Sequence, residues 1–337
     1  MQANWQQFLT EQGAIIEDGI VQHFGDIAAE LTAAAKQTVL CDLGQFSTLR
    51  VSGEDAQSFL QNLLSNDIKE VSATRAQYSS FNTAKGRMLA NFLIWMDGND
   101  YLLQLPGTLA EMLRKKLSMY VLRAKVKIVC DESIALGISG TSAQLPVNCG
   151  ELPVLGVLRA ENTSVIKLGD TRFLLCTAPE NAITLWQTLI KNAKPVGSTC
   201  WDWLNIRAGI PVILEKTQEE FVPQMVNFDL IGGINFKKGC YPGQEIVARM
   251  HYLGKLKRRM YLAHVDGDTK PGDDLYSEDM SGQASGKIAN AAPSPIGGYD
   301  VLAVMQIASH DAHEVHLGSL QGPALSFEPL PYSLPSI

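Results

Sequence analysis

The same pattern of apolar and polar residues occurs twice in the first 200 residues. Residues 51–56 (VSGEDA) are echoed by residues 138–143 (ISGTSA). Each copy is followed by an apolar run, a proline with small residues, and apolar positions spaced i, i+3, i+4, at 101–113 and again at 173–186. This order predicts a strand, a turn and a helix in both places. The chain is therefore expected to contain two similar α+β halves, the second shorter.

Further elements of the first half can be predicted from their hydrophobic pattern. Residues 57–64 have the spacing of an amphipathic helix. Its apolar face would carry Phe59, Leu60, Leu63 and Leu64. Residues 91–95 and 126–129 are apolar runs of strand length, so both are predicted to be strands.

The pattern changes after residue 259 to short apolar runs separated by Gly, Pro and Asp. Regular short strands of this kind are typical of a small antiparallel β-barrel, here of about 80 residues. The predicted fold class is therefore α+β, with two similar α+β halves and a small C-terminal antiparallel barrel. The predicted domains are residues 1–130, 131–255 and 256–337.

Composition and charge narrow the possible functions. The 337 residues are 46% hydrophobic and 19% charged, which is typical of a globular chain of two or three domains. No secretory signal or membrane-spanning run is found, so a soluble cytoplasmic protein is expected. The net charge of −7 disfavours broad polyanion binding as the main task. Basic runs at 114–116 and 255–259 are either solvated faces or contacts for a small anion or one stretch of RNA backbone.

The six cysteines are spread singly and no C-x-x-C occurs, which disfavours a dedicated zinc or iron-sulfur site. Cys240 differs from the others in its surroundings. Lys238 precedes it, and Gly243 follows in a turn that opens a predicted helix. An ammonium group and a helix N-terminus both lower a thiol pKa, so Cys240 is either an activated thiol or a buried cysteine in a turn.

Three other features of the sequence bear on its possible chemistry. His310, His313 and His316 have helical spacing, but a predicted strand over 301–307 and a turn after it favour ordinary hairpin histidines over a metal site. The motifs of triad hydrolases, P-loop enzymes and dinucleotide dehydrogenases do not occur. Trp201 begins a predicted helix that ends at a Gly209 cap, and its ring either packs in the core or stacks on a planar heterocycle.

The octapeptide 238–245 (KGCYPGQE) resembles the K-G-C-Y-x-G-Q-E signature of the YgfZ family, folate-binding proteins linked to tRNA modification and related to the glycine-cleavage T-protein. The resemblance covers roughly residues 42–260. It is supported by stretches at 52–67, 82–87, 208–211 and 221–227.

The resemblance implies a three-domain ring around a hole that holds tetrahydrofolate between the α+β halves. It also implies a role in maintaining or repairing iron-sulfur enzymes, including those that methylthiolate tRNA. Cys240 would be the functional thiol and Lys238 its activator. The folate-stacking aromatics would be Phe46 and Trp201. Further folate contacts would come from Arg87, Tyr241, Gln244 and Glu245, and the anionic glutamate tail would meet Lys85, Arg87 and the cluster near Lys255.

One departure from the T-proteins bears on catalysis. Their folate-side carboxylate lies in a Gly-Gly-x-x-Asp-Asp strand, whereas residues 86–91 here read GRMLAN. Neither Ala90 nor Asn91 titrates, so this chain is expected not to catalyse aminomethyl transfer by the T-protein route. An accessory role is favoured. The alternatives are another folate-dependent one-carbon transferase and a direct tRNA-binding factor.

Overall fold

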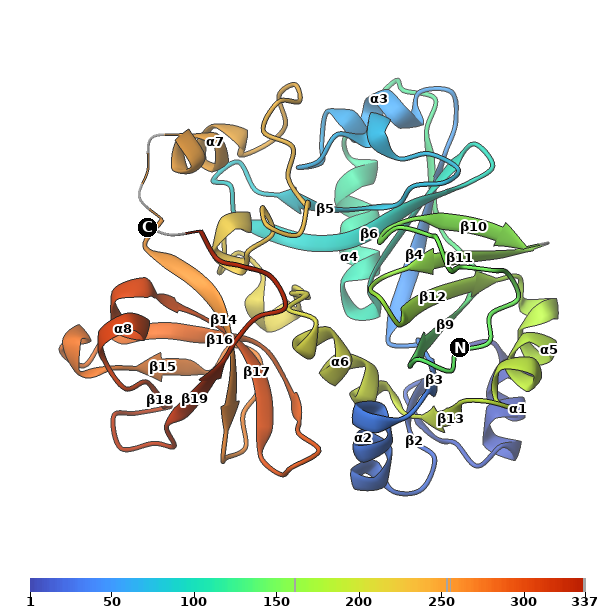
Figure 1. Ribbon diagram of the computed structural model, residues 1–337. Helices are drawn as coiled ribbons and strands as arrows, with labels where there is room; N and C mark the ends of the chain where they lie inside the picture. Colours follow the sequence, from blue (N-terminus) through green and yellow to red (C-terminus); the bar gives the residue numbers. More distant parts are fainter. Residues whose placement is uncertain (161, 253, 255, 336–337) are drawn as a thin grey trace. The chain divides into compact units, whose positions relative to one another are not determined.

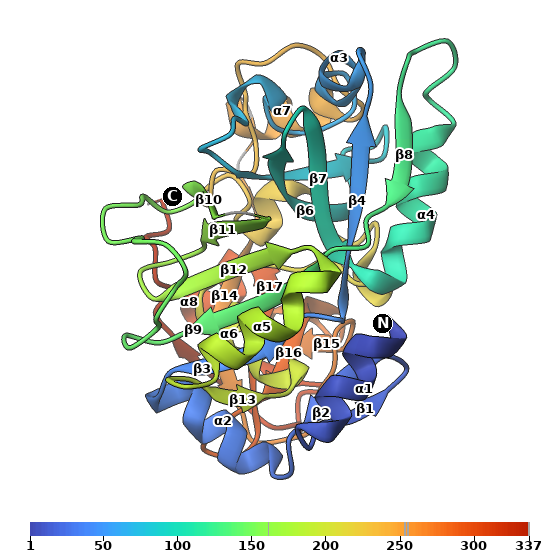
Figure 2. The same ribbon diagram turned by 90° about the vertical axis from the view of Figure 1, so that its right-hand side faces the viewer.

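The computed structural model describes residues 1–160, 162–252, 254 and 256–335 (Figures 1 and 2). The chain divides into two compact units. Unit 1 contains Met1–Ala56, Lys69–Gln77 and Leu93–Trp201. Unit 2 contains Gln57–Ile68, Tyr78–Phe92 and the described part of Asp202–Ile337. The domain boundaries expected from the sequence remain predictions.

The helices of the described ranges are α1 (Ala3–Glu11), α2 (Ile27–Lys36), α3 (Ala56–Gln61), α4 (Gly107–Ser118), α5 (Pro179–Leu189), α6 (Ser198–Arg207), α7 (Gln244–Tyr252) and α8 (Ile307–Ala312). Short 3₁₀ turns are η1 (Ile68–Glu70), η2 (Glu215–Thr217), η3 (Pro223–Val226) and η4 (Glu278–Met280). None of the helices in these ranges has the length and apolar character needed to cross a membrane.

A first sheet has the order β5-β6-β7-β4-β8. Its strands are β4 (Phe46–Ser52), β5 (Gln77–Asn82), β6 (Met88–Asp97), β7 (Asp100–Pro106) and β8 (Lys127–Cys130). The strands predicted at 91–95 and 126–129 are thus confirmed within β6 and β8. Helix α4 packs on β4 and β8 with an apolar face that includes Leu113 and Leu117 (Figure 2).

A second sheet has the order β10-β11-β12-β9-β3-β13. Its strands are β3 (Val39–Asp42), β9 (Ile134–Ser139), β10 (Val157–Ala160), β11 (Thr163–Lys167), β12 (Arg172–Thr177) and β13 (Lys194–Val196). All pairs are antiparallel except β13 with β3. A separate hairpin joins β1 (Ile15–Glu17) to β2 (Ile20–His23). The N-terminal α1 completes this region, because Trp5 packs edge-on against Trp186 of α5 at 5.7 Å.

The internal repeat is confirmed by two matching glycine turns. Gly53 follows β4 with φ +115°, and Gly140 follows β9 with φ +138°. A Cβ would lie 2.0 Å from the Lys125 carbonyl oxygen at the first and 2.4 Å from the Thr38 Cα at the second. Only glycine fits such backbone approaches, so the shared S-G dipeptide marks the same turn twice. The halves differ because β3 is inserted between β9 and β13 in the second.

The C-terminal part of unit 2 is an antiparallel sheet of order β18-β15-β16-β17-β14-β19, visible as a curled sheet in Figure 1. Its strands are β14 (Arg258–Val265), β15 (Asp274–Tyr276), β16 (Ala284–Pro293), β17 (Tyr299–Gln306), β18 (His316–Leu317) and β19 (Leu325–Glu328). A bridge between His316 and Ala324 joins the two edges. The turn signals predicted a small antiparallel barrel, and the structure confirms this in part, as a curled antiparallel sheet.

Two local predictions need correction. The predicted helix over 57–64 ends early, because α3 stops at Gln61 and turns follow, although the four apolar side chains are buried as expected. The predicted turn at 309–313 is largely the short helix α8, which starts where β17 ends. His310 stacks on Tyr261 there with ring centroids 3.7 Å apart, while His316 lies in β18.

Candidate functional site

The loop formed by the signature octapeptide is anchored by the buried side chain of Lys238. This side chain is 7% exposed. Its Nζ donates to the carbonyl oxygens of Gln61 and Leu64, both at 2.6 Å, and of Asn66 at 3.1 Å. These three acceptors, here called the carbonyl cage, lie at and just after the C-terminal end of α3, where the helix dipole favours a cation. Lys238 therefore ties the loop to a segment more than 170 residues earlier in the chain.

Burial lowers the pKa of Lys238 to about 8, while the charge of Asp67 opposes this. Its ammonium also lies 5.1 Å from the centroid of the Tyr241 ring, a cation–π distance. Tyr241 is buried, which raises the pKa of its hydroxyl. Gln244 closes the loop by donating its side-chain amide to the Lys238 carbonyl oxygen at 3.3 Å. The geometry gives Lys238 a positioning role, and its role as thiol activator stays a prediction.

Two glycines bring the loop against a second turn. Gly243 has φ +80°, and a Cβ on it would lie 2.3 Å from the Thr83 carbonyl oxygen and 2.6 Å from the Gly86 Cα. Gly86 itself has φ +71°. Beside this contact, Arg87 donates to the Glu220 carbonyl oxygen, and Lys85 is exposed. The signature glycine and the 82–87 stretch are thus parts of one packed structure.

Cys240 is exposed, which excludes the alternative of a cysteine buried in a turn. Cys130 is also exposed, whereas Cys41, Cys149, Cys176 and Cys200 are buried. A thiol that faces solvent on a loop anchored at both ends is open to a partner molecule. Glu245, in the first turn of α7, is exposed as well. The cluster near Lys255 lies partly outside the described residues.

In unit 1, Phe46 lines a cavity of about 480 Å³, called here the Phe46 cavity. Its other walls include Trp5, Asp42, Thr48 and Cys130. Asp42 is 3% exposed, and its carboxylate accepts from Trp5 Nε1 at 2.7 Å and from the Gly44 N–H at 2.9 Å. Burial raises the pKa of Asp42 to about 6.

The Phe46 cavity has the size and the polar groups of a small-molecule site. Small-molecule sites typically enclose about 300–1,000 Å³ and combine apolar walls with a few fixed polar groups. Phe46 offers a ring face for a planar heterocycle, and the Asp42 carboxylate has acceptor capacity beyond its two bonds.

Trp201 does not line the Phe46 cavity. It is 2% exposed and packs so closely on β9 that a Cβ at Gly137 would lie 2.5 Å from its ring. The Arg172 guanidinium carbon lies 4.9 Å from the ring centroid. Trp201 thus belongs to the core of unit 1, and its role in folate stacking stays a prediction.

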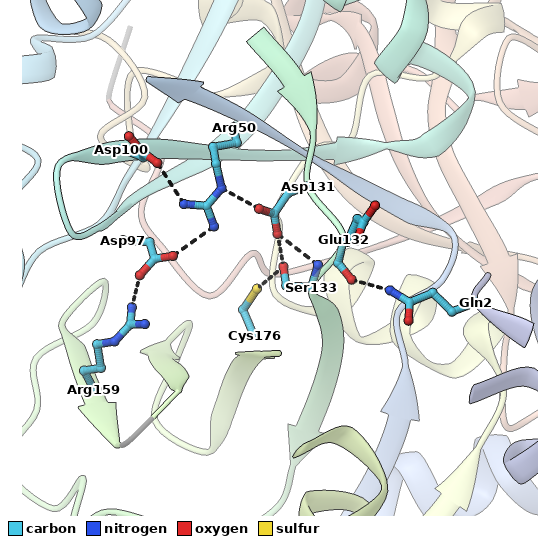
Figure 3. A network of polar contacts seen from close by, with 9 residues as sticks. All are labelled: Gln2, Arg50, Asp97, Asp100, Asp131, Glu132, Ser133, Arg159 and Cys176. Carbon is cyan, nitrogen blue, oxygen red and sulfur yellow. Dashed lines mark hydrogen bonds and ion pairs between the residues drawn. The ribbon is translucent and has the colours of Figure 1, made fainter. Parts of the chain in front are cut away.

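A polar network, drawn in Figure 3, includes residues that line both the Phe46 cavity and a second cavity of about 400 Å³. Arg50 of β4 donates to three carboxylates, Asp131 at 2.6 Å, Asp97 at 2.9 Å and Asp100 at 3.0 Å. Burial disfavours the charge of Arg50, but these bonds outweigh it and raise its pKa. Arg50 thereby holds together the β6–β7 turn and the end of β8.

The same network reaches a buried thiol. Ser133 donates an amide and contacts Asp131 through its hydroxyl, which also lies 2.9 Å from Cys176 Sγ. Burial raises the pKa of Cys176 to about 12, so this thiol is protonated at neutral pH and is a poor nucleophile. Asp131 and Ser133 line both cavities. The network therefore shapes the cavity walls rather than supplying a second reactive sulfur.

Asn91, where the T-proteins have a carboxylate, is fully engaged in structure. It is 6% exposed, its amide donates to the Pro211 carbonyl oxygen at 2.7 Å, and its side-chain oxygen accepts from the Ile213 N–H at 2.8 Å. The side chain pins segment 211–213 to β6 and does not titrate.

Asp42, Arg50 and Asp131 were not identified from the sequence. Their signal was weak, because each is a single charged residue in or beside an apolar strand, with its partners far away in the chain. A charged side chain in a buried strand requires a partner of opposite charge or a hydrogen bond. This requirement is the signal by which the three residues could have been identified.

Comparison with known proteins gives consistent results. Residues 21–147 match the GCVT N-terminal domain. The chain is 32% identical over 244 residues to "tRNA-modifying protein YgfZ" of Photobacterium profundum, covering 71% of this chain and 74% of the relative. It is 30% identical to the protein of the same name from Edwardsiella ictaluri, covering 90% and 95%.

A solved structure gives a match over nearly the whole fold. The glycine cleavage system aminomethyltransferase T from Bartonella henselae superposes with a TM-score of 0.80 and 16% identity, covering 97% of this chain and 96% of that one. At this identity the match shows a shared fold.

Proposed function

Because this chain belongs to the YgfZ family, we propose that it is a folate-binding accessory protein that supports the maintenance or repair of iron-sulfur enzymes, including enzymes that methylthiolate tRNA. The name of its relatives supports the link to tRNA modification, and the T-protein fold supports the use of a folate. The observation that carries the proposal is the exposed Cys240 on a loop held by the carbonyl cage.

Each of these groups of residues has its own task in the proposal. Phe46 provides a ring face for the pterin, and Asp42 accepts hydrogen bonds from the pterin N–H groups. Trp201 remains the second predicted stacking ring. A bound tetrahydrofolate would supply one-carbon or reducing chemistry. Arg87, Tyr241, Gln244 and Glu245 remain the predicted further contacts. Lys238 and Gly243 fix the loop so that the Cys240 thiol meets a client protein with little loss of conformational freedom.

The absence of the T-protein carboxylate favours an accessory role over aminomethyl transfer. Asn91 has both amide atoms engaged with segment 211–213, so it is not available to steer or deprotonate a folate amine. Incubation of the pure protein with labelled methylated amines and tetrahydrofolate tests this point. Catalytic turnover would establish a transferase instead.

The thiol is tested by complementation. In cells that lack this protein, Cys240→Ala is expected to fail to restore the methylthiolated tRNA level, while its fold and folate affinity are retained. Cys149→Ala is the control for loss of a thiol elsewhere, since Cys149 lies in unit 1 and is not among the residues that line the Phe46 cavity. Full complementation by Cys240→Ala would disprove the role of this thiol.

Folate binding is tested separately by fluorescence titration with tetrahydrofolate. Phe46→Ala is expected to weaken binding by about 1–3 kcal/mol, the typical contribution of one stacked aromatic ring. Trp203→Phe is a suitable control, because Trp203 donates to Asp300 at 2.8 Å and has no assigned role. No saturable binding to the unmodified protein would refute the folate part of the proposal.

A further inference from the structure

At the C-terminal end of α7, His251 and Tyr252 form a group of three aromatic rings with Phe236 of the preceding loop, called here the Tyr252 platform. Phe236 and His251 are stacked with centroids 3.7 Å apart and planes 12° apart. Tyr252 stands edge-on to His251 at 4.8 Å. The Tyr252 side chain is 63% exposed and His251 is exposed as well. The platform therefore presents ring surface to solvent.

A second group with the same geometry shows that stacking alone is not evidence of a site. His310 stacks on Tyr261 at 3.7 Å, and Phe327 stands edge-on to both. That group is structural, because Tyr261 is 7% exposed and belongs to the core of the C-terminal sheet. The Tyr252 platform differs in its exposure, which leaves aromatic surface open to a partner.

The chain segment that contains the platform is basic, whereas the chain as a whole is acidic. Residues 230–264 contain seven lysines and arginines and one acidic residue, Glu245, whereas the full chain has 28 basic and 35 acidic residues. Two of the seven are used internally, since Lys238 occupies the carbonyl cage and Arg259 forms a paired contact with Asp229 at 2.7 and 3.0 Å. Lys237, Arg249 and Lys257 are exposed. The platform thus lies in a segment with a local excess of positive surface charge.

We propose that the Tyr252 platform binds single-stranded RNA, with a base stacked on Tyr252 and phosphates paired with Lys237, Arg249 and Lys257. Exposed rings within a basic surface are the usual combination for single-stranded nucleic acids, because every base has a face to stack and every linkage has a charge. An acidic peptide would use the charge but not the ring faces. Single-stranded RNA would use both the ring faces and the positive charge of the platform.

This inference goes beyond the proposed function, because it requires neither folate nor a thiol. Phe236 packs against the C-terminal end of α7, and Gly243 directly precedes its first residue. The segment between them, which contains Cys240, therefore runs alongside α7. RNA on the platform would therefore bind beside the loop that carries Cys240.

Fluorescence anisotropy with a labelled oligouridine of about 12 nucleotides, within the usual site sizes, tests the inference on the full chain. Tyr252→Ala is expected to weaken binding about fivefold to 150-fold, and Tyr252→Phe to leave it unchanged. Arg249→Gln is expected to lower the slope of log affinity against log salt by about 0.7. Cys240→Ala should bind normally, which separates this test from that of the thiol. Circular dichroism checks that each variant is folded.

The matched control is Tyr120→Ala. Tyr120 is 47% exposed in unit 1 and follows the basic run 114–116, so it reports on binding by any basic surface with an exposed ring. Its substitution should leave the affinity unchanged. The inference is overturned if oligouridine does not bind at low salt, if Tyr120→Ala weakens binding as much as Tyr252→Ala, or if an RNA duplex binds as tightly as the single strand. Tyr252-dependent binding to phosphatidylserine vesicles in place of RNA would also overturn it.

Discussion

Replacement of Lys238 by methionine tests whether the carbonyl cage holds the signature loop. Methionine has a similar length and fills the same space, but it leaves the carbonyl oxygens of Gln61, Leu64 and Asn66 without the ammonium donor. Each hydrogen bond to a charged group contributes about 1.5–3 kcal/mol, so the three together contribute about 4.5–9 kcal/mol. Burial of the ammonium opposes this by about 3 kcal/mol, from the fall in its pKa from 10.5 to about 8. The net expected loss of unfolding free energy is about 1.5–6 kcal/mol.

Urea denaturation followed by circular dichroism measures this loss, with Lys237→Met as the matched control. Lys237 is exposed and its substitution should change the unfolding free energy by less than about 0.5 kcal/mol. Equal stability of the two variants would refute the role of the cage.

The same variant has a pH signature. Since the folded pKa of Lys238 is lowered to about 8, the unfolded chain binds more protons between pH 8 and pH 10.5. The unfolding free energy contributed by this group should therefore rise with pH across that window, by up to about 3 kcal/mol. Lys238→Met should lack the rise. An identical pH dependence in both proteins would show that the ammonium is not held as described.

Three further outcomes are expected. Gly243→Ala should lower the unfolding free energy by about 2–4 kcal/mol, because it combines a left-handed backbone with a clash against the 83–86 turn; Gly239→Ala, in the same loop with open space around it, should have little effect in the same urea assay. Gly137→Ala should displace the Trp201 ring at a cost of about 1–3 kcal/mol and shift its fluorescence, and an unchanged spectrum would contradict the packing described. Asp42 should make stability fall as pH rises from about 4 to 6, by up to about 3 kcal/mol, because its folded pKa is raised to about 6 and the folded state binds more protons in that window; Asp42→Asn should lack this fall in pH-dependent denaturation.

The sequence by itself determined the features that depend on neighbouring residues. The S-G dipeptides at Gly53 and Gly140 marked two equivalent turns, because a positive φ and a close backbone approach leave room for glycine alone. Gly209, with φ +64°, ends α6 as its position predicted. The short apolar runs separated by Gly, Pro and Asp after residue 259 predicted antiparallel strands. The polar, glycine-flanked setting of Cys240 left both an activated thiol and a buried cysteine open, and only the structure shows that it is exposed.

The tertiary structure alone decided which distant groups meet. From the sequence, Lys238 was predicted to act on the nearby Cys240. Its ammonium group instead donates to carbonyl oxygens at residues 61–66, and no local pattern encodes a partner so far along the chain. Trp201 had two possible environments, and the close approach of Gly137 from β9 placed it in the core. Arg50 and its three carboxylates come from separate strands and turns that only the folded sheets bring together. Local spacing fixes backbone conformation, whereas burial and charge pairing depend on contacts that exist only after the chain has folded.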